Sequence, residues 1–86
     1  MKEYLIICRS ITFAQRASRT LYRAGISNQV LRLPVGLVKS GCGYAVKIRS
    51  DDPERALRAM EREHMRPMTL FLSENGIYQE VRYDLP

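Results

Sequence analysis

The chain begins with an uninterrupted apolar segment and then changes to a helical spacing. Residues 4–8 are apolar throughout, and a short run of this kind predicts a strand buried in the centre of a sheet. Apolar side chains then recur at three- and four-residue intervals, at Ala14, Ala17, Leu21 and Ala24. This spacing predicts the buried stripe of an amphipathic helix, which Ser10 or Thr12 would cap at its start and Gly25 would end.

Two further strands are predicted on either side of a glycine-rich segment. Residues 29–33 predict the first, which Pro34 ends because proline has no amide hydrogen for a ladder. Residues 34–43 contain three glycines and predict a loop. Residues 44–49 alternate in polarity, which predicts the second strand. Its inward face would carry Tyr44, Val46 and Ile48.

The second half of the chain predicts another helix and a hairpin. Two aspartates, a proline and a glutamate at residues 51–54 mark a helix start, and Pro67 is expected to end the helix. Its inner face would carry Ala56, Leu57, Met60 and His64. A strand is predicted over residues 68–72, and the Asn-Gly pair at residues 75–76 predicts a tight turn. A returning strand would then occupy residues 77–83.

The order strand-helix-strand-strand-helix-strand is that of a ferredoxin-like α+β sandwich. We expect an antiparallel sheet with two helices on one face and an extra C-terminal strand. Residues 1–86 would form a single domain, with a core at about residues 4–73 and a hairpin strand or tail at residues 76–86. Right-handed crossovers would bring four features to one edge: the end of the first strand, the start of the first helix, the loop and the end of the second helix.

The charge of the chain favours anionic partners. Its net charge is +5, from 14 Lys and Arg against 9 Asp and Glu, and eleven of the basic residues are arginines. Arginine suits bidentate contacts with carboxylate or phosphate, although genomic composition alone can also enrich a surface in arginine. Three arginines follow the polar face of the first predicted helix, at Arg16, Arg19 and Arg23. This stripe is either a solvated face or a docking surface for an acidic protein or RNA.

Several classes of function are disfavoured. No apolar run approaches the roughly 18 residues that span a membrane, and the first apolar stretch is too short for a signal peptide. We therefore expect a cytoplasmic protein without membrane insertion. One histidine and two cysteines are too few for a conventional zinc site, and no catalytic triad or phosphate-binding glycine loop is present. We expect no metal and no cofactor, and a carrier or accessory protein in preference to an independent enzyme.

Cys42 is the residue best suited to chemistry. It stands between Gly41 and Gly43, which leave its sulfur accessible and the neighbouring amides open to an anion. The thiolate is the reactive form, and a helix N-terminus or nearby cations lower a thiol pKa from about 8.5. The predicted edge supplies the start of the first helix together with Arg9 and Lys39, with Arg66 as a further candidate. The alternative is a buried loop cysteine that fills a small gap.

Other residues of the predicted edge have two interpretations each. Arg9 is expected to bind an anion or stabilise the thiolate, while Ser10 and Thr12 would cap the helix and share its amides with that anion. Cys8 is expected in the core, with a resolving thiol for Cys42 as its other role. His64 is expected to be half-buried on the inner helical face, or else to act as a base for Cys42.

These motifs resemble a small bacterial family of sulfur/selenium carrier-like domains, from Tyr4 to about Phe71. The similarity consists of Ser10-Ile11-Thr12 before an alanine-rich helix, then Ala24-Gly25-Ile26, Leu33-Pro34 and, as the most specific piece, Ser40-Gly41-Cys42-Gly43-Tyr44-Ala45. One departure is Val35-Gly36, where a polar or basic residue is expected. The resemblance implies that Cys42 carries sulfur or selenium, with Gly43 in its motif. It also implies sulfur or selenium donor and acceptor proteins as partners.

Three functions are therefore compared. The first is a carrier that holds a persulfide or selenide on Cys42. The second is a nucleic-acid module, which is disfavoured because the central strands offer only Tyr4 and Tyr44 for base stacking. The third is an interaction domain that senses a small anion at the predicted edge without thiol chemistry. The sequence leaves open the oligomeric state and the choice between sulfur and selenium.

Overall fold

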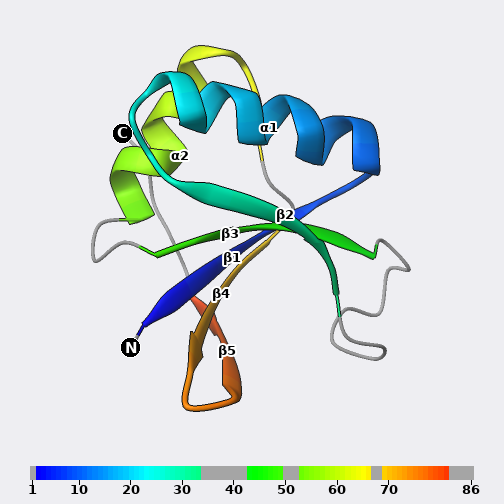
Figure 1. The fold of residues 1–86 in the computed structure, drawn as a ribbon, viewed down its shortest axis with the longest axis vertical. Coiled ribbons are helices and arrows are strands. Elements are labelled where there is room, and N and C mark those ends of the chain that lie inside the picture. Colours follow the sequence, from blue (N-terminus) through cyan, green and yellow to red (C-terminus); the bar gives the residue numbers. More distant parts are fainter. Residues whose placement is uncertain (1, 34–42, 50–52, 67–68, 82–86) are drawn as a thin grey trace.

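The computed structural model describes residues 2–33, 43–49, 53–66 and 69–81. In chain order the elements are β1 (Glu3–Cys8), α1 (Ile11–Arg23), β2 (Asn28–Arg32), β3 (Tyr44–Ile48), α2 (Pro53–Arg62), β4 (Thr69–Glu74) and β5 (Ile77–Val81). The strands form one antiparallel sheet in the order β2-β3-β1-β4-β5, and both helices cover the same face of it (Figure 1). This is the predicted ferredoxin-like α+β arrangement with an added C-terminal strand.

Helix α1 begins and ends where the sequence predicts. The hydroxyl of Ser10 accepts a hydrogen bond from the amide of Phe13 at 3.0 Å and caps the helix. At the other end Gly25 has a φ of +79°. The amides of Gly25 and Ile26 donate to carbonyls of the last turn at 3.0 and 2.9 Å, which is the Schellman arrangement. The predicted stripe is confirmed, with buried Ala14, Ala17 and Leu21 and half-buried Ala24.

Helix α2 ends earlier than the sequence predicts, at Arg62. The expectation that His64 lies on the inner helical face is wrong: it follows the helix, is exposed and has a φ of +59°. Its amide donates to the carbonyl of Glu61 at 2.9 Å, and the amide of Met65 donates to that of Met60 at 3.0 Å. Histidine therefore occupies the position of a Schellman motif that usually holds glycine, and Met65 enters the core beyond it.

The sheet has an apolar cluster on each face. Successive side chains of a strand point to opposite faces, and β1 is buried on both, which explains its uninterrupted apolar run. The cluster beneath the helices joins Ile6, Cys8 and Val46 of the sheet to Leu21 of α1 and Met60 of α2. The smaller cluster lies on the other face. Its buried members are Leu5, Ile7, Leu33, Ala45 and Phe71.

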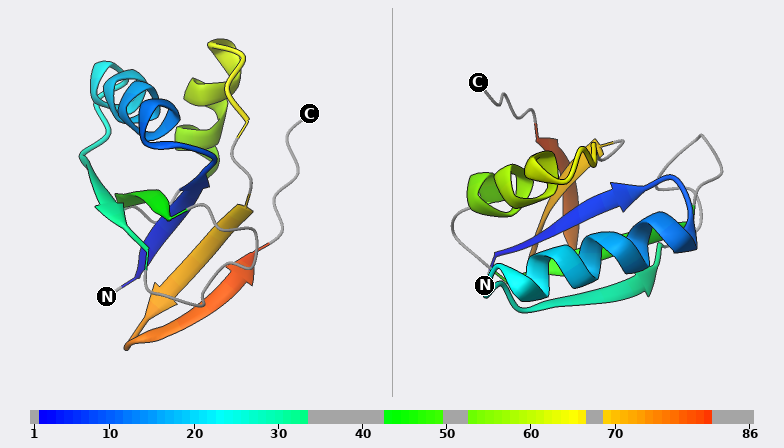
Figure 2. Two further views of the ribbon diagram at one scale, coloured as in Figure 1. Left: turned by 90° about the vertical axis from the view of Figure 1, so that its right-hand side faces the viewer. Right: turned by 90° about the horizontal axis from the view of Figure 1, so that it is seen from above.

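The C-terminal hairpin confirms the strongest turn signal in the sequence. Asn75 and Gly76 have φ values of +53° and +79°, as a two-residue type I′ turn requires. The turn returns the chain as β5 along β4 at the edge of the sheet (Figure 2). Strand boundaries differ from the predicted ones by one or two residues, because hydrogen-bond pairing decides where a strand ends.

Candidate functional site

Strand pairing brings the residues that flank the glycine-rich segment beside the end of β1, which leads into α1. Cys8, which ends β1, pairs with Tyr44, which begins β3, and Tyr44 also pairs with Arg32, which ends β2. Beyond these pairs the amide of Leu33 donates to the carbonyl of Gly43 at 2.7 Å. The predicted convergence of these segments on one edge is therefore present. Cys42 and Gly41 themselves, with the rest of residues 34–42, lie outside the described residues.

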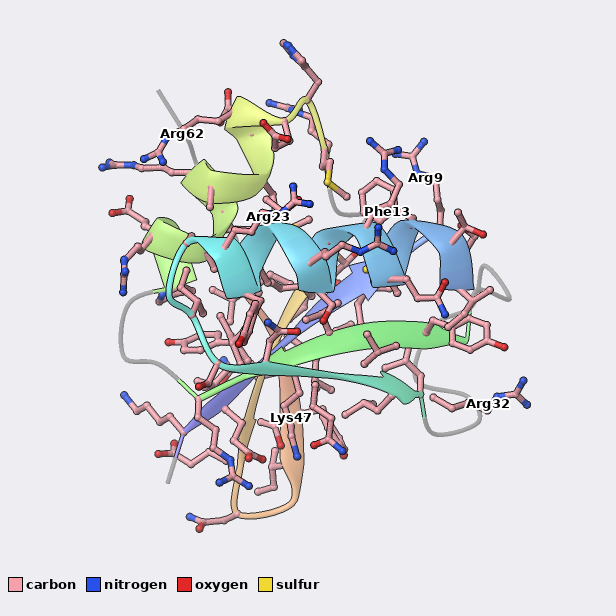
Figure 3. The ribbon with its side chains drawn as sticks, turned by 45° about the horizontal axis from the view of Figure 1, so that its top comes forward. Arg9, Phe13, Arg23, Arg32, Lys47 and Arg62 are labelled. Carbon is pink, nitrogen blue, oxygen red and sulfur yellow. The ribbon has the colours of Figure 1, made fainter. Side chains whose placement is uncertain are left out.

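We call this edge the rim and define it by Arg9, Ser10, Arg32, Tyr44 and Arg66. Arg9 is exposed, and its guanidinium lies 5.3 Å from the centroid of the Phe13 ring. Its Nη2 donates to the backbone carbonyl of Arg66 at 3.4 Å. Arg9 thus joins the start of α1 to the segment that follows α2. The last turn of α2 itself does not reach this edge, because Arg62 lies with Arg23 and Ala24 at the other end of α1. Figure 3 shows Arg9 beside Phe13 at this end of the molecule.

A second guanidinium at the rim was not singled out from the sequence. Nη2 of Arg32 donates to the hydroxyl of Tyr44 at 3.0 Å, and the guanidinium lies 5.4 Å from the centroid of the Tyr44 ring. The hydrogen bond with Tyr44 raises the pKa of Arg32. The sequence signal that could have identified this pair is its position. Arg32 and Tyr44 flank the glycine-rich loop, and antiparallel pairing of the two flanking strands places them opposite each other.

The start of α1 is electropositive. Its first turn contains no acidic residue, so no side chain of that turn offsets the positive end of the helix dipole. Ser10 caps the helix, which confirms one of its two predicted roles. Thr12 is exposed in the first turn, and its contact with an anion stays a prediction. The arrangement favours a negative charge placed beside this turn.

The other two predicted residues have different outcomes. Cys8 is fully buried in the core, and its Sγ donates to the carbonyl of Ile6 at 3.3 Å, which confirms the core interpretation. His64 is exposed after α2, so its half-buried placement is wrong. The proposed assistance of either residue to Cys42 stays a prediction, because Cys42 is outside the described residues.

The aromatic residues considered for base stacking point away from the open face of the sheet. Tyr4 and Tyr44 pack against the cluster beneath the helices, which removes them as a stacking platform on the other face. Among the described residues, no group of three or more His, Cys, Asp or Glu side chains could hold a metal ion. In the same part of the chain, neither helix has the length and apolar character needed to cross a membrane.

Comparison with known proteins links this arrangement to one family. The model of the family described as "Putative Se/S carrier protein-like" matches residues 3–77, a range that includes the rim and the sequence of the glycine-rich loop. A search of curated proteins and a search of solved structures found no match.

Proposed function

The chain belongs to the Se/S carrier-like family, and on that basis we propose that Cys42 holds the sulfur or selenium atom during transfer. The observation that carries the proposal is the hydrogen bond of 2.7 Å between Leu33 and Gly43. It anchors the two ends of the loop at the rim. Cys42 precedes Gly43 directly, and neighbouring Cα atoms are about 3.8 Å apart, which limits how far the thiol can lie from this anchor.

The charges at the rim support a reactive thiol. A thiolate is stabilised by a helix N-terminus and by nearby cations, and the rim has both. The Phe13 ring and the Arg66 carbonyl hold Arg9 beside the start of α1, while Tyr44 holds Arg32 at the end of β2. These contacts orient the guanidinium groups. The same groups would stabilise the negative charge of a persulfide or selenide.

The proposed transfer is a pair of exchange steps. The Cys42 thiolate attacks the outer sulfur of a persulfide on the donor protein, the donor S–S bond breaks, and the donor cysteine leaves as a thiolate. Cys42 then carries the persulfide, and no external oxidant or reductant is consumed. A nucleophile of the acceptor attacks the outer sulfur, and the Cys42 thiolate leaves. Exchange at a selenium atom bonded to the donor cysteine moves selenium in the same way.

Sulfur loading tests this proposal. The protein is incubated with a cysteine desulfurase and cysteine, and its peptides are analysed by mass spectrometry without reductant. We expect the mass of one added sulfur atom on the peptide that contains Cys42, and none in a Cys42→Ser variant. Selenocysteine in place of cysteine shows whether selenium is accepted. Equal loading of the variant, or an adduct confined to Cys8, would contradict the proposal.

A further inference from the structure

A groove lies between α1 and α2, at the opposite end of α1 from the rim. Its volume is about 290 Å³, and it is lined by Thr20, Arg23, Ala24, Ala59, Arg62 and Glu63. Ala24 and Ala59 leave the groove open because their methyl groups fill little of the space between the helices. Arg55 joins the helices nearby, where its Nη2 donates to the carbonyl of Ala24 at 2.8 Å.

The arginines of α1, and Arg62 on α2, have no acidic partner within the part of the chain that the structure describes. Helix α1 carries Arg16, Arg19 and Arg23 and no acidic residue. Neither these three side chains nor Arg62 forms an ion pair with any residue that the structure describes. Arg58, one turn before Arg62 on α2, does pair with Glu54 at 3.8 Å. Like charges three or four residues apart repel each other along a helix, and an anionic partner would relieve that repulsion.

We propose that this groove binds an acidic segment of a partner protein, with a carboxylate held by Arg23 and Arg62. Figure 3 shows the two side chains coming from neighbouring helices. Arginine binds carboxylates in a bidentate manner, and the groove has room for one or two side chains. None of the described residues that line it is aromatic, so they offer no platform for base stacking. Glu63 also lines the groove, where it can accept hydrogen bonds from the backbone amides of a protein segment, whereas a phosphodiester backbone has no donor to offer it.

The test measures where an acidic peptide binds. Isotopically labelled protein is titrated with a peptide of about ten glutamates at about 50 mM salt, where surface charges are weakly screened, and amide shifts are followed by NMR. The largest shifts are expected at Thr20, Ala24 and Ala59. A Cys42→Ser variant should give the same shifts, since binding at the groove does not involve the thiol. The sulfur-transfer proposal can therefore fail while this inference holds, and this inference can fail while sulfur transfer is confirmed.

Two double variants that lose the same charge separate a specific site from general attraction. Arg23→Gln with Arg62→Gln should weaken binding about tenfold or more, as expected for lost charge-assisted hydrogen bonds. Lys47→Gln with Arg49→Gln removes two charges that contact Glu3 at 3.7 and 3.0 Å, and should change affinity by no more than about twofold. Figure 3 shows Lys47 on the other side of the sheet from the helices.

The outcomes that overturn the inference are distinct. Equal weakening in the two double variants would mean that affinity follows net charge alone. Shifts centred on the rim, or no binding of the peptide at this salt concentration, would also overturn it. Tighter binding of a uridine oligonucleotide that is lost in the Arg23 and Arg62 variant would assign the groove to nucleic acid instead.

Discussion

His64 has a backbone conformation that residues with a Cβ avoid. Its φ of +59° places it in the left-handed region, where a non-glycine residue costs of order 1–2 kcal/mol. The conformation is maintained because it closes α2 with two backbone hydrogen bonds and turns Met65 into the core. The sequence draws attention to the imidazole of His64, but the fold depends on its backbone conformation.

Replacement of His64 should reveal this cost. His64→Gly should raise the free energy of unfolding by about 0.5–1 kcal/mol, since relief of the left-handed strain exceeds the added entropy of the unfolded chain. His64→Val should lower it, because β-branched residues tolerate this region worst. Gly25→Ala is the matched control at the end of α1, where φ is +79°, and should cost about 1 kcal/mol. Urea denaturation measures all three, and a less stable His64→Gly would contradict the account.

At the scale of elements, local chemistry decided how much of the fold was predictable. Capping by Ser10, the glycine after α1 and the Asn-Gly turn each depend on neighbouring residues, and each was recognised. The end of α2 was missed because His64 follows Met60 at helical spacing whether or not the helix continues, and histidine gives no stop signal. At the rim, Arg9 was found from its place after β1, whereas the Arg32–Tyr44 pair depends on a register that only the assembled sheet provides.

Helix α1 should become more stable when its run of positive charge is interrupted. Arg19→Glu replaces two repulsive pairs, with Arg16 and Arg23, by two attractive ones, and should raise the free energy of unfolding by about 0.5–1 kcal/mol. Arg19→Gln, which removes the charge without reversing it, should give about half of this gain. Thermal denaturation followed by circular dichroism measures both variants. A destabilised Arg19→Glu would show that Arg19 makes a favourable contact within the fold.

At the scale of the whole molecule, topology gathers groups that are distant in the sequence. The antiparallel order places the ends of β1 and β2 and the start of β3 side by side, and the contact between Arg9 and Arg66 adds the segment after α2. Each segment alone offers only a few polar or charged residues. Together they place Arg9 beside the first turn of α1 and Arg32 against Tyr44, on the edge where Leu33 and Gly43 join the two ends of the loop.

The pH dependence of Cys42 alkylation by iodoacetamide tests this central claim most directly. Alkylation is followed on separate peptides, so that the buried Cys8 does not contribute. A thiol beside the start of α1 and Arg9 should react with a midpoint below the value of about 8.5 typical of a free cysteine. Arg9→Gln should move the midpoint upward. A midpoint at or above about 8.5 in the natural protein, unchanged in Arg9→Gln, would contradict the account.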